Sequence, residues 1–352
     1  MMRAPVFACT ALICATAHAQ VGPEPAVLRA RDLTPFGLQR LDMRPADMSD
    51  RPIGRWTAEL QAAYQNTFVM SDDVHDYLQD RDQGRLPLRP EDARALLMAP
   101  HDSYYVDVEV GVLDFILQRR FTQRFAAFVE VPYIHYGHSR LDRLIEDFHD
   151  AAGLSQMGRD LVARDRFQIL YHFGDTRLQM LDREVTGGLG DPIVGVRYMS
   201  SLAGRWQFAL EGAAKLPVAG ERLLLSTGEI DVGLQAAMRR RFGRATLQAS
   251  AIAVHYSGGL ESAADELIPT LIVAGSYAWT PAASIIAQGH VSRSVVRGTS
   301  IDELSDNKYQ VSLGLQSSVR RWTWTFAITE NIGNYNNTPD VGFQLGLAYS
   351  GQ

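Results

Sequence analysis

The stretch GRWQFALEGAAKLPVAG, residues 204–220, decides the fold class. From Trp206 to Leu216 every second position is apolar or small, and Glu211 and Lys215 lie on the opposite face. A period of two is the signature of a β-strand. Most soluble strands have about 5–6 residues, whereas a tilted strand needs about 9–11 residues to cross a bilayer. The length and the two unlike faces therefore indicate a transmembrane strand, with Glu211 and Lys215 turned toward the lumen.

The same alternation recurs in about twelve segments between residue 55 and the C-terminus. Five tight connections, at 119–125, 200–206, 240–245, 278–284 and 317–323, separate longer ones at 69–103, 137–190, 219–228, 257–267, 298–306 and 333–340. Short turns at one rim and long loops at the other are typical of an outer-membrane barrel. Aromatic residues beside the tight turns fit an interfacial girdle. The alternative is a soluble β-sandwich or barrel, whose strands are shorter and share one core.

The predicted fold is therefore all-β: an antiparallel up-and-down transmembrane β-barrel of about twelve strands with a helical extracellular loop. The strand count is open by two, because segments 166–172 and 177–183 fit either an extra hairpin above the membrane or part of the wall. The barrel is expected over residues 55–352, with long loops at 69–103 and 137–190.

The N-terminus resembles a secretory signal peptide over residues 1–19, with Arg3, an apolar stretch and a small-residue cleavage site. Both cysteines, Cys9 and Cys14, lie inside it, so the mature chain is expected to contain neither a disulfide nor a thiolate metal site. Residues 20–54 are rich in Pro and Arg without a period, and are interpreted as an irregular leader in the periplasm. The signal peptide and the barrel pattern together predict that the protein is located in the outer membrane of a Gram-negative bacterium.

The net charge of −6 argues against a nucleic-acid partner. No metal signature or cofactor motif is recognised, so we expect neither a metal nor a cofactor. The expected partners are outer-membrane lipids and lipopolysaccharide, the outer-membrane assembly machinery and an unknown small solute.

Alternation also predicts which polar residues line the lumen. Both charge signs occur among them, so they either line a path for a small solute or pair with one another and fill the lumen. The candidates are Glu59, Glu130, Arg197, Glu211, Lys215, Asp231, Arg239, Gln288 and His290.

Segment 141–154 carries Leu141, Leu144, Ile145 and Phe148 at helical spacing inside a long loop. One hypothesis is a gate that folds over or into the barrel mouth. The other is a helix on the outer rim whose apolar face packs on strand ends. Three carboxylates of this segment recur every four residues and fit either a solvated face or, less readily, calcium: Asp142, Glu146 and Asp150.

The mature chain resembles an uncharacterised proteobacterial family of porin-like outer-membrane β-barrels, domain of unknown function 3187. The resemblance rests on the loop GHSRLDRLIEDFHDAAGLSQMGRD (137–160) and on GGLGDPIVGVRY (187–198). It implies a barrel but brings no activity and no catalytic residues.

We therefore expect a porin-like channel or facilitator for a small solute, and no enzyme. One alternative is a closed structural or ligand-binding barrel. A less favoured one is an outer-membrane lipid hydrolase, for which the nearest candidates are His255, Tyr256, Ser257, His290 and Ser292.

Overall fold

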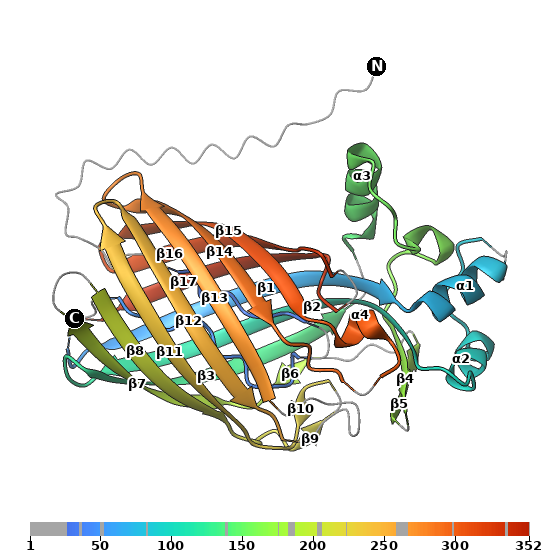
Figure 1. Cartoon of the computed structure of the whole chain (residues 1–352), viewed down its shortest axis with the longest axis horizontal. Helices are drawn as coiled ribbons and strands as arrows, with labels where there is room; N and C mark the ends of the chain where they lie inside the picture. The colour runs from blue at the N-terminus through green and yellow to red at the C-terminus, as the bar shows by residue number, and fades with distance from the viewer. Residues whose placement is uncertain are drawn as a thin grey trace.

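Twelve antiparallel strands close into a barrel in the computed structural model (Figure 1). The structure describes residues 27–34, 37–49, 53–81, 84–137, 140–174, 176–181, 187–202, 206–222, 224–257, 267–297, 299–334 and 337–351. The predicted signal peptide, residues 1–19, lies outside this part of the chain. The closed antiparallel barrel confirms the predicted fold class.

The barrel strands follow one another around the wall, and the last pairs with the first, from Thr57 opposite Ser350 to Asn66 opposite Val341. They are β1 (Trp56–Met70), β2 (Ser103–Arg120), β3 (Phe125–Gly137), β7 (Ile193–Leu202), β8 (Trp206–Lys215), β11 (Asp231–Phe242), β12 (Ala245–His255), β13 (Leu267–Ala278), β14 (Ala283–Ser292), β15 (Lys308–Val319), β16 (Trp322–Asn331) and β17 (Val341–Ser350).

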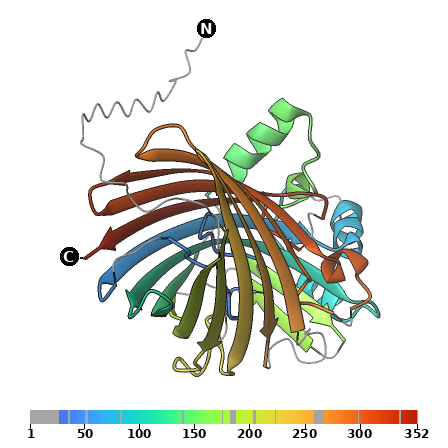
Figure 2. The same cartoon turned by 60° about the vertical axis from the view of Figure 1, so that its left-hand side comes forward.

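The remaining elements lie in the long connections, at the end of the barrel that we call the outer end (Figures 1 and 2). They are α1 (Asp72–Asp80), α2 (Pro90–Leu97), α3 (Asp142–Ala152), the 3-10 helix η1 (Arg159–Leu161), β4 (Gln168–Phe173), β5 (Thr176–Leu181), β6 (Gly188–Leu189), β9 (Glu221–Arg222), β10 (Ser226–Thr227) and α4 (Asp302–Ser305). Within the described residues, none of these helices has the length and apolar character needed to cross a membrane.

The β4–β5 hairpin settles the strand count. β4 pairs with β2 only over Ser103–Asp107, whereas β3 pairs with β2 from Glu109 onward. The hairpin therefore extends the sheet beyond the closed ring, at the outer end, and is not one of the strands that close it.

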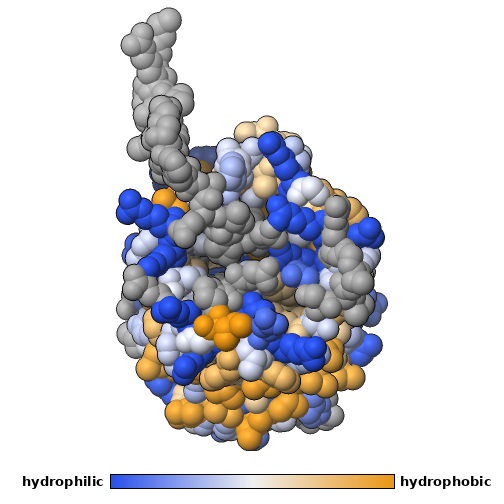
Figure 3. Space-filling view, turned by 90° about the vertical axis from the view of Figure 1, so that its left-hand side faces the viewer, coloured by the Kyte–Doolittle hydropathy of each residue, from blue (hydrophilic) through white to orange (hydrophobic). Residues whose placement is uncertain are grey.

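Apolar and polar residues alternate along the strands, so the apolar side chains lie on the outside of the barrel and the polar ones on the inside. Leu210, Leu234 and Leu313 are 60, 72 and 60% exposed, whereas the neighbouring polar residues Glu211, Gln235 and Ser312 are buried. In the view from the end with the tight turns, hydrophilic residues lie around the rim and hydrophobic residues cover the outer wall (Figure 3). An apolar outer wall of this kind contacts lipid, because a monomeric soluble protein exposes far smaller apolar patches.

In the outer part of β2 the apolar side chains point into the barrel and a polar one points outward, which is the opposite of the pattern expected for a transmembrane strand. Val106, Val108 and Val110 point into the barrel, where they join an apolar cluster with the loop residue Phe167. Glu109 points outward, yet it is buried because the loop at Arg140 covers it. The reversal has a physical cause: here the outside of the wall meets protein loops instead of lipid, and the inside is a core.

Candidate functional site

The described residues 27–34 and 37–49 of the leader lie inside the barrel. Its backbone N–H groups donate to wall side chains, from Leu28 to Gln288 Oε1 (3.1 Å) and from Ala46 to Gln235 Oε1 (2.6 Å). We call residues 27–34 and 37–49 the plug. The expectation of a periplasmic leader is wrong for these residues. Their irregular conformation was expected, and it has a clear cause: the polar backbone groups are satisfied by the wall and not by a regular element.

The plug runs from the end with the tight turns toward the outer end and back. Near the outer end, Leu41 N donates to Asp231 Oδ2 at 2.9 Å. On the return path, Met48 O accepts from Arg239 Nη1 at 2.9 Å. Asp231 and Arg239 are eight residues apart on β11, which corresponds to about 27 Å along a strand. The plug therefore occupies much of the length of the lumen.

Two arginines of the plug meet two carboxylates of the wall at the centre of the lumen. Arg31 Nη1 lies 2.9 Å from Asp114 Oδ1, and Arg44 Nη2 lies 2.9 Å from Glu130 Oε1 and also contacts Asp114. All four side chains are buried. Two cations and two anions balance, which is what permits the burial of charge.

Charged side chains also hold other parts of the plug. Arg29 Nε lies 3.4 Å from Glu59 Oε2, and Lys308 of β15 pairs with Asp32. At the outer end Lys215 Nζ donates to the backbone oxygen of Gln39 in the plug at 2.9 Å. The same Nζ lies 3.2 Å from Asp231 Oδ2 on the wall. Ion pairs thus tie the first part of the plug and Arg44 to the wall, and hydrogen bonds from charged wall residues hold the rest.

One pair joins neighbouring strands as well as the plug. Arg197 of β7 and Glu211 of β8 are register partners, and their side chains form an ion pair. Arg197 Nη1 also donates to the backbone oxygen of Asp47 at 2.9 Å. The wall therefore presents preformed donors to the plug.

Inner-face glycines make room for the plug. A Cβ on Gly314 would lie 2.6 Å from Leu28 Cδ2 and 2.7 Å from Phe326 O, and one on Gly233 would overlap Met43. These positions accept no larger residue without a shift of the plug or the strand.

The structure turns all nine predicted lumen residues toward the inside. Eight of them are buried, and His290 is half-buried with its Nδ1 3.2 Å from Gln310 Oε1. Among the wall residues that contact the plug and were not predicted are Asp114, Gln248, Gln344 and Lys308. A signal for the plug was present: the leader is rich in Arg, and the inner face carries carboxylates.

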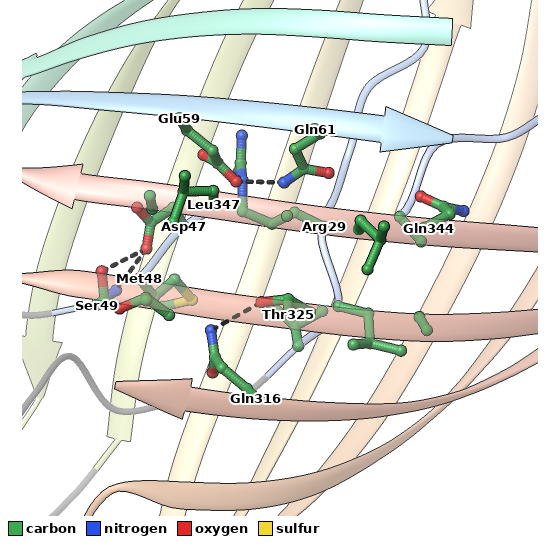
Figure 4. Close-up of a pocket in the computed structure, with 18 of the residues that line it drawn as sticks. Arg29, Asp47, Met48, Ser49, Glu59, Gln61, Gln316, Thr325, Gln344 and Leu347 are labelled. Carbon is green, nitrogen blue, oxygen red and sulfur yellow. Dashed lines mark hydrogen bonds and ion pairs between the residues drawn. The ribbon is translucent and has the colours of Figure 1, made fainter. Parts of the chain in front are cut away.

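A cavity of about 70 Å³ remains between the plug and the wall near the tight turns. Figure 4 shows Glu59, Gln316 and Thr325 around it, with Arg29 reaching in from the plug. A space of this size holds a few water molecules. It is smaller than the roughly 300 Å³ at which ligand pockets begin.

The outer half of the lumen is filled by an apolar core. Leu38 and Leu41 of the plug pack in one cluster with Val108 and Val254 of the wall, and Leu304 of α4 joins them from a loop. The barrel is therefore closed by polar contacts along its length and by apolar packing at the outer end.

Helix α3 does not enter the mouth, and the gate hypothesis for Leu141, Leu144, Ile145 and Phe148 is wrong. Ile145 is 7% exposed, but Leu144 and Phe148 are 62 and 60% exposed, and Leu141 is half-buried. The helix turns its charged face to the protein, because Asp142 pairs there with Arg159 at 3.0 Å. The alternative of an apolar face packed on strand ends is also wrong for Leu144 and Phe148, and only Ile145 of the four is buried.

Two of the three carboxylates considered for calcium, Asp142 and Glu146, pair with arginines, and Asp150 accepts from Gln156 Nε2 at 2.6 Å. Glu146 lies 2.9 Å from Arg85 and also contacts Arg164. Burial acts to raise the pKa of Glu146, but the hydrogen bonds from Arg164 and Arg85 outweigh it and hold that pKa below its ordinary value. In the part of the chain that the structure describes, no three acidic, His or Cys side chains are grouped as a metal site.

The residues considered for a hydrolase are not brought together. His255 is exposed on the outside of β12, whereas the adjacent Tyr256 points inward and donates to Leu41 O of the plug. His290 is on the inside of β14. The wall separates His255 from His290, so these two cannot act on one substrate atom.

Solved structures similar to this chain include outer-membrane channels and porins. The COG4313 outer membrane channel from Pseudomonas putida F1 shares 13% identity with a TM-score of 0.51, over 88% of this chain and all of that one. NanC porin shares 7% identity (TM-score 0.42, 68% of this chain and 93% of that one). The P. putida toluene transporter TodX shares 9% (TM-score 0.38, 85% and 90%). No curated protein matches the sequence.

The fold is that of outer-membrane channels, and the apolar outer wall matches this location. The protein is thus a β-barrel of the outer membrane. A family model covers residues 91–350, from the second helix of the first long loop to the last strand. The chain belongs to the family described as Protein of unknown function (DUF3187).

Proposed function

We propose that this protein conducts a small polar solute across the outer membrane when the plug moves. The observation that carries the proposal is the chemistry of the contact between plug and wall. Outside the apolar core at the outer end, which holds Leu38 and Leu41, this contact consists mostly of separate ion pairs and hydrogen bonds. Examples are Arg31 with Asp114 and Ala46 with Gln235. Water or a polar solute replaces such contacts one at a time, whereas a continuous apolar interface would have to separate as a whole.

The charges of the wall indicate which solutes the open lumen favours. When the plug leaves, Asp114 and Glu130 lose their contacts with Arg31 and Arg44. The centre of the lumen then carries uncompensated negative charge, which attracts cations and repels anions. We therefore expect the open channel to prefer cations and neutral polar solutes.

Planar-bilayer recordings test the proposal. The full-length protein should show a small or intermittent current, and a variant that lacks residues 27–49 should show a larger and steady one. Heat-modifiable migration on a gel serves as the control that both proteins form the barrel. A folded deletion variant without any current would contradict the channel and favour a closed structural or ligand-binding barrel.

A reversible cross-link separates movement of the plug from leakage around it. Ala46 of the plug and Ala237 of β11 share one small apolar cluster, and the only native cysteines are Cys9 and Cys14. Ala46→Cys with Ala237→Cys, joined by a short cleavable thiol reagent, should abolish the current, and cleavage should restore it. The two single variants are the controls. An unchanged current in the cross-linked protein would mean that solutes pass a stationary plug.

The charge preference has its own test. In the deletion variant, the reversal potential in a salt gradient should indicate cation selectivity. Asp114→Asn with Glu130→Gln in the same background should reduce it. An anion preference in the deletion variant would contradict the assignment of these two carboxylates as the selectivity determinants.

A further inference from the structure

Helix α3 presents an apolar face to the surroundings. Leu144 and Phe148 lie one turn apart on the eleven-residue helix and are both mostly exposed. Leu154, just after the helix, is 53% exposed. Neighbouring exposed apolar residues of this kind mark a surface that contacts a partner or a membrane.

The helix is fixed in this orientation by its charged face. Asp142 accepts from Arg159 at 3.0 Å and from Asn66 Nδ2 at 3.2 Å, and Glu146 pairs with Arg85. A rotation that buried Phe148 would separate these charges from their partners. The exposure of the apolar face is therefore imposed by the contacts of the opposite face.

The start of α3 is attached to the top of the lipid-facing wall. On β1, the exposed outward row Trp56, Leu60, Tyr64 ends at Tyr64. The Tyr64 hydroxyl bonds to Glu109, and Glu109 Oε1 accepts the backbone N–H groups of Arg140 and Leu141 at 2.6 Å each. One side chain thus connects the last lipid-facing residue of β1 with the start of α3.

The helix also extends sideways from the barrel. Asn66, which bonds to Asp142 of α3, is the next outward position of β1 after Tyr64. In both cartoon views α3 projects beyond the wall at the outer end and away from the barrel axis (Figures 1 and 2). This places the helix beside the barrel, above the lipids that surround it.

We propose that α3 is an interfacial helix whose Leu144 and Phe148 insert into the outer-leaflet lipid surface next to the barrel. The lipid is the occupant because the apolar face begins where the lipid-contacting row of β1 ends. An amphipathic helix with one apolar and one charged face lies in this way at the boundary between headgroups and acyl chains. The loop thereby anchors the outer end of the barrel to the leaflet. This anchoring requires only that the barrel lies in the membrane, and it is independent of whether the barrel conducts.

Single-cysteine spin labels test the position of α3 in the membrane. Leu144→Cys and Phe148→Cys are labelled in vesicles that contain lipopolysaccharide, and collision with oxygen is compared with collision with a water-soluble nickel chelate. Leu313→Cys, in the lipid-facing wall, is the control for lipid. Asp147→Cys on α3 and Asp73→Cys on α1, both exposed, are the controls for water.

We expect the ratio of oxygen to nickel collisions at positions 144 and 148 to be at least several-fold above that at 147 and 73, and closer to that at 313. A ratio equal to that at position 73 would overturn the proposal. Spin–spin coupling between labels at 148 that persists when vesicles hold few proteins would also overturn it, because the face would then be covered by a second copy.

Discussion

Arg31 of the plug and Asp114 of β2 form a buried ion pair, with 2.9 Å between Nη1 and Oδ1, although they are 83 positions apart in the chain. A buried pair adds little net stability, since desolvation offsets the attraction, but the loss of one partner leaves a costly charge behind. The pair therefore fixes the path of the plug through the barrel more than it stabilises the barrel. The same reasoning applies to Arg44, which shares Asp114 with Arg31.

Asp114→Asn should loosen the plug. The change removes one of two carboxylates that balance Arg31 and Arg44, at a cost of about 3–5 kcal/mol to the plugged state. The frequency of open events in planar bilayers should rise, and a protease added on the periplasmic side should cleave the leader faster. Asp73→Asn, in an exposed turn of α1, is the control. If both variants behave like the unmodified protein, the central ion pairs do not hold the plug.

Gly314→Val should displace the plug by steric overlap. Its Cβ would approach Leu28 and the backbone oxygen of Phe326 within 2.7 Å, so either the plug or β16 has to move. The expected result is a raised open probability with a barrel that still shows heat-modifiable migration. Gly289→Val, at a position with no atom within 4 Å of an added Cβ, is the matched control. Equal conductance in the two variants would contradict a close fit between plug and wall.

The docking of α3 should weaken in acid. The pKa of Glu146 is lowered, against the effect of burial, by hydrogen bonds from Arg164 and Arg85. A lowered pKa in the folded state stabilises at pH values above the ordinary glutamate pKa of about 4.3, and this contribution is lost as the pH falls through the folded value. A spin label on α3 should therefore gain mobility in the acid window below about pH 4.3. In Glu146→Gln the mobility should be raised already at pH 7 and change little in that window. A pH response that survives in Glu146→Gln would assign the effect to other groups.

A charge on the lipid-facing wall should impair folding into the membrane. Leu313, at the middle of β15, is 60% exposed, and Leu313→Arg should cost about 2–4 kcal/mol if it lies near the bilayer midplane. Val218→Arg is the control, because Val218 is 73% exposed but lies in the connection after β8. Urea unfolding in vesicles, followed by gel migration, measures the difference. Similar unfolding midpoints would place residue 313 outside the lipid.

The amino-acid sequence by itself determined the barrel. The period of two determines which side chains share a face of the strand, so that Leu210 points outward and Glu211 points into the lumen. The alternation of tight and long connections determines the order of the strands around the barrel. Both signals are local, because the faces of a strand and the length of a turn depend on neighbouring residues. The inward orientation of all nine lumen residues follows from the same rule.

Only the tertiary structure decided what fills and covers the barrel. The plug sequence shows no periodic pattern of apolar residues, because its backbone is held by distant wall side chains. The backbone N–H groups of Leu28 and Ala46 donate to side chains about 260 and 190 positions away. The valines of outer β2 point inward because loops, not lipid, cover the opposite side. Helix α3 shows its apolar face outward because Arg159 and Arg85 hold its charged face. The path of the plug, the orientation of the β2 valines and the orientation of α3 each depend on contacts with residues far away in the chain. These residues come together only when the barrel closes.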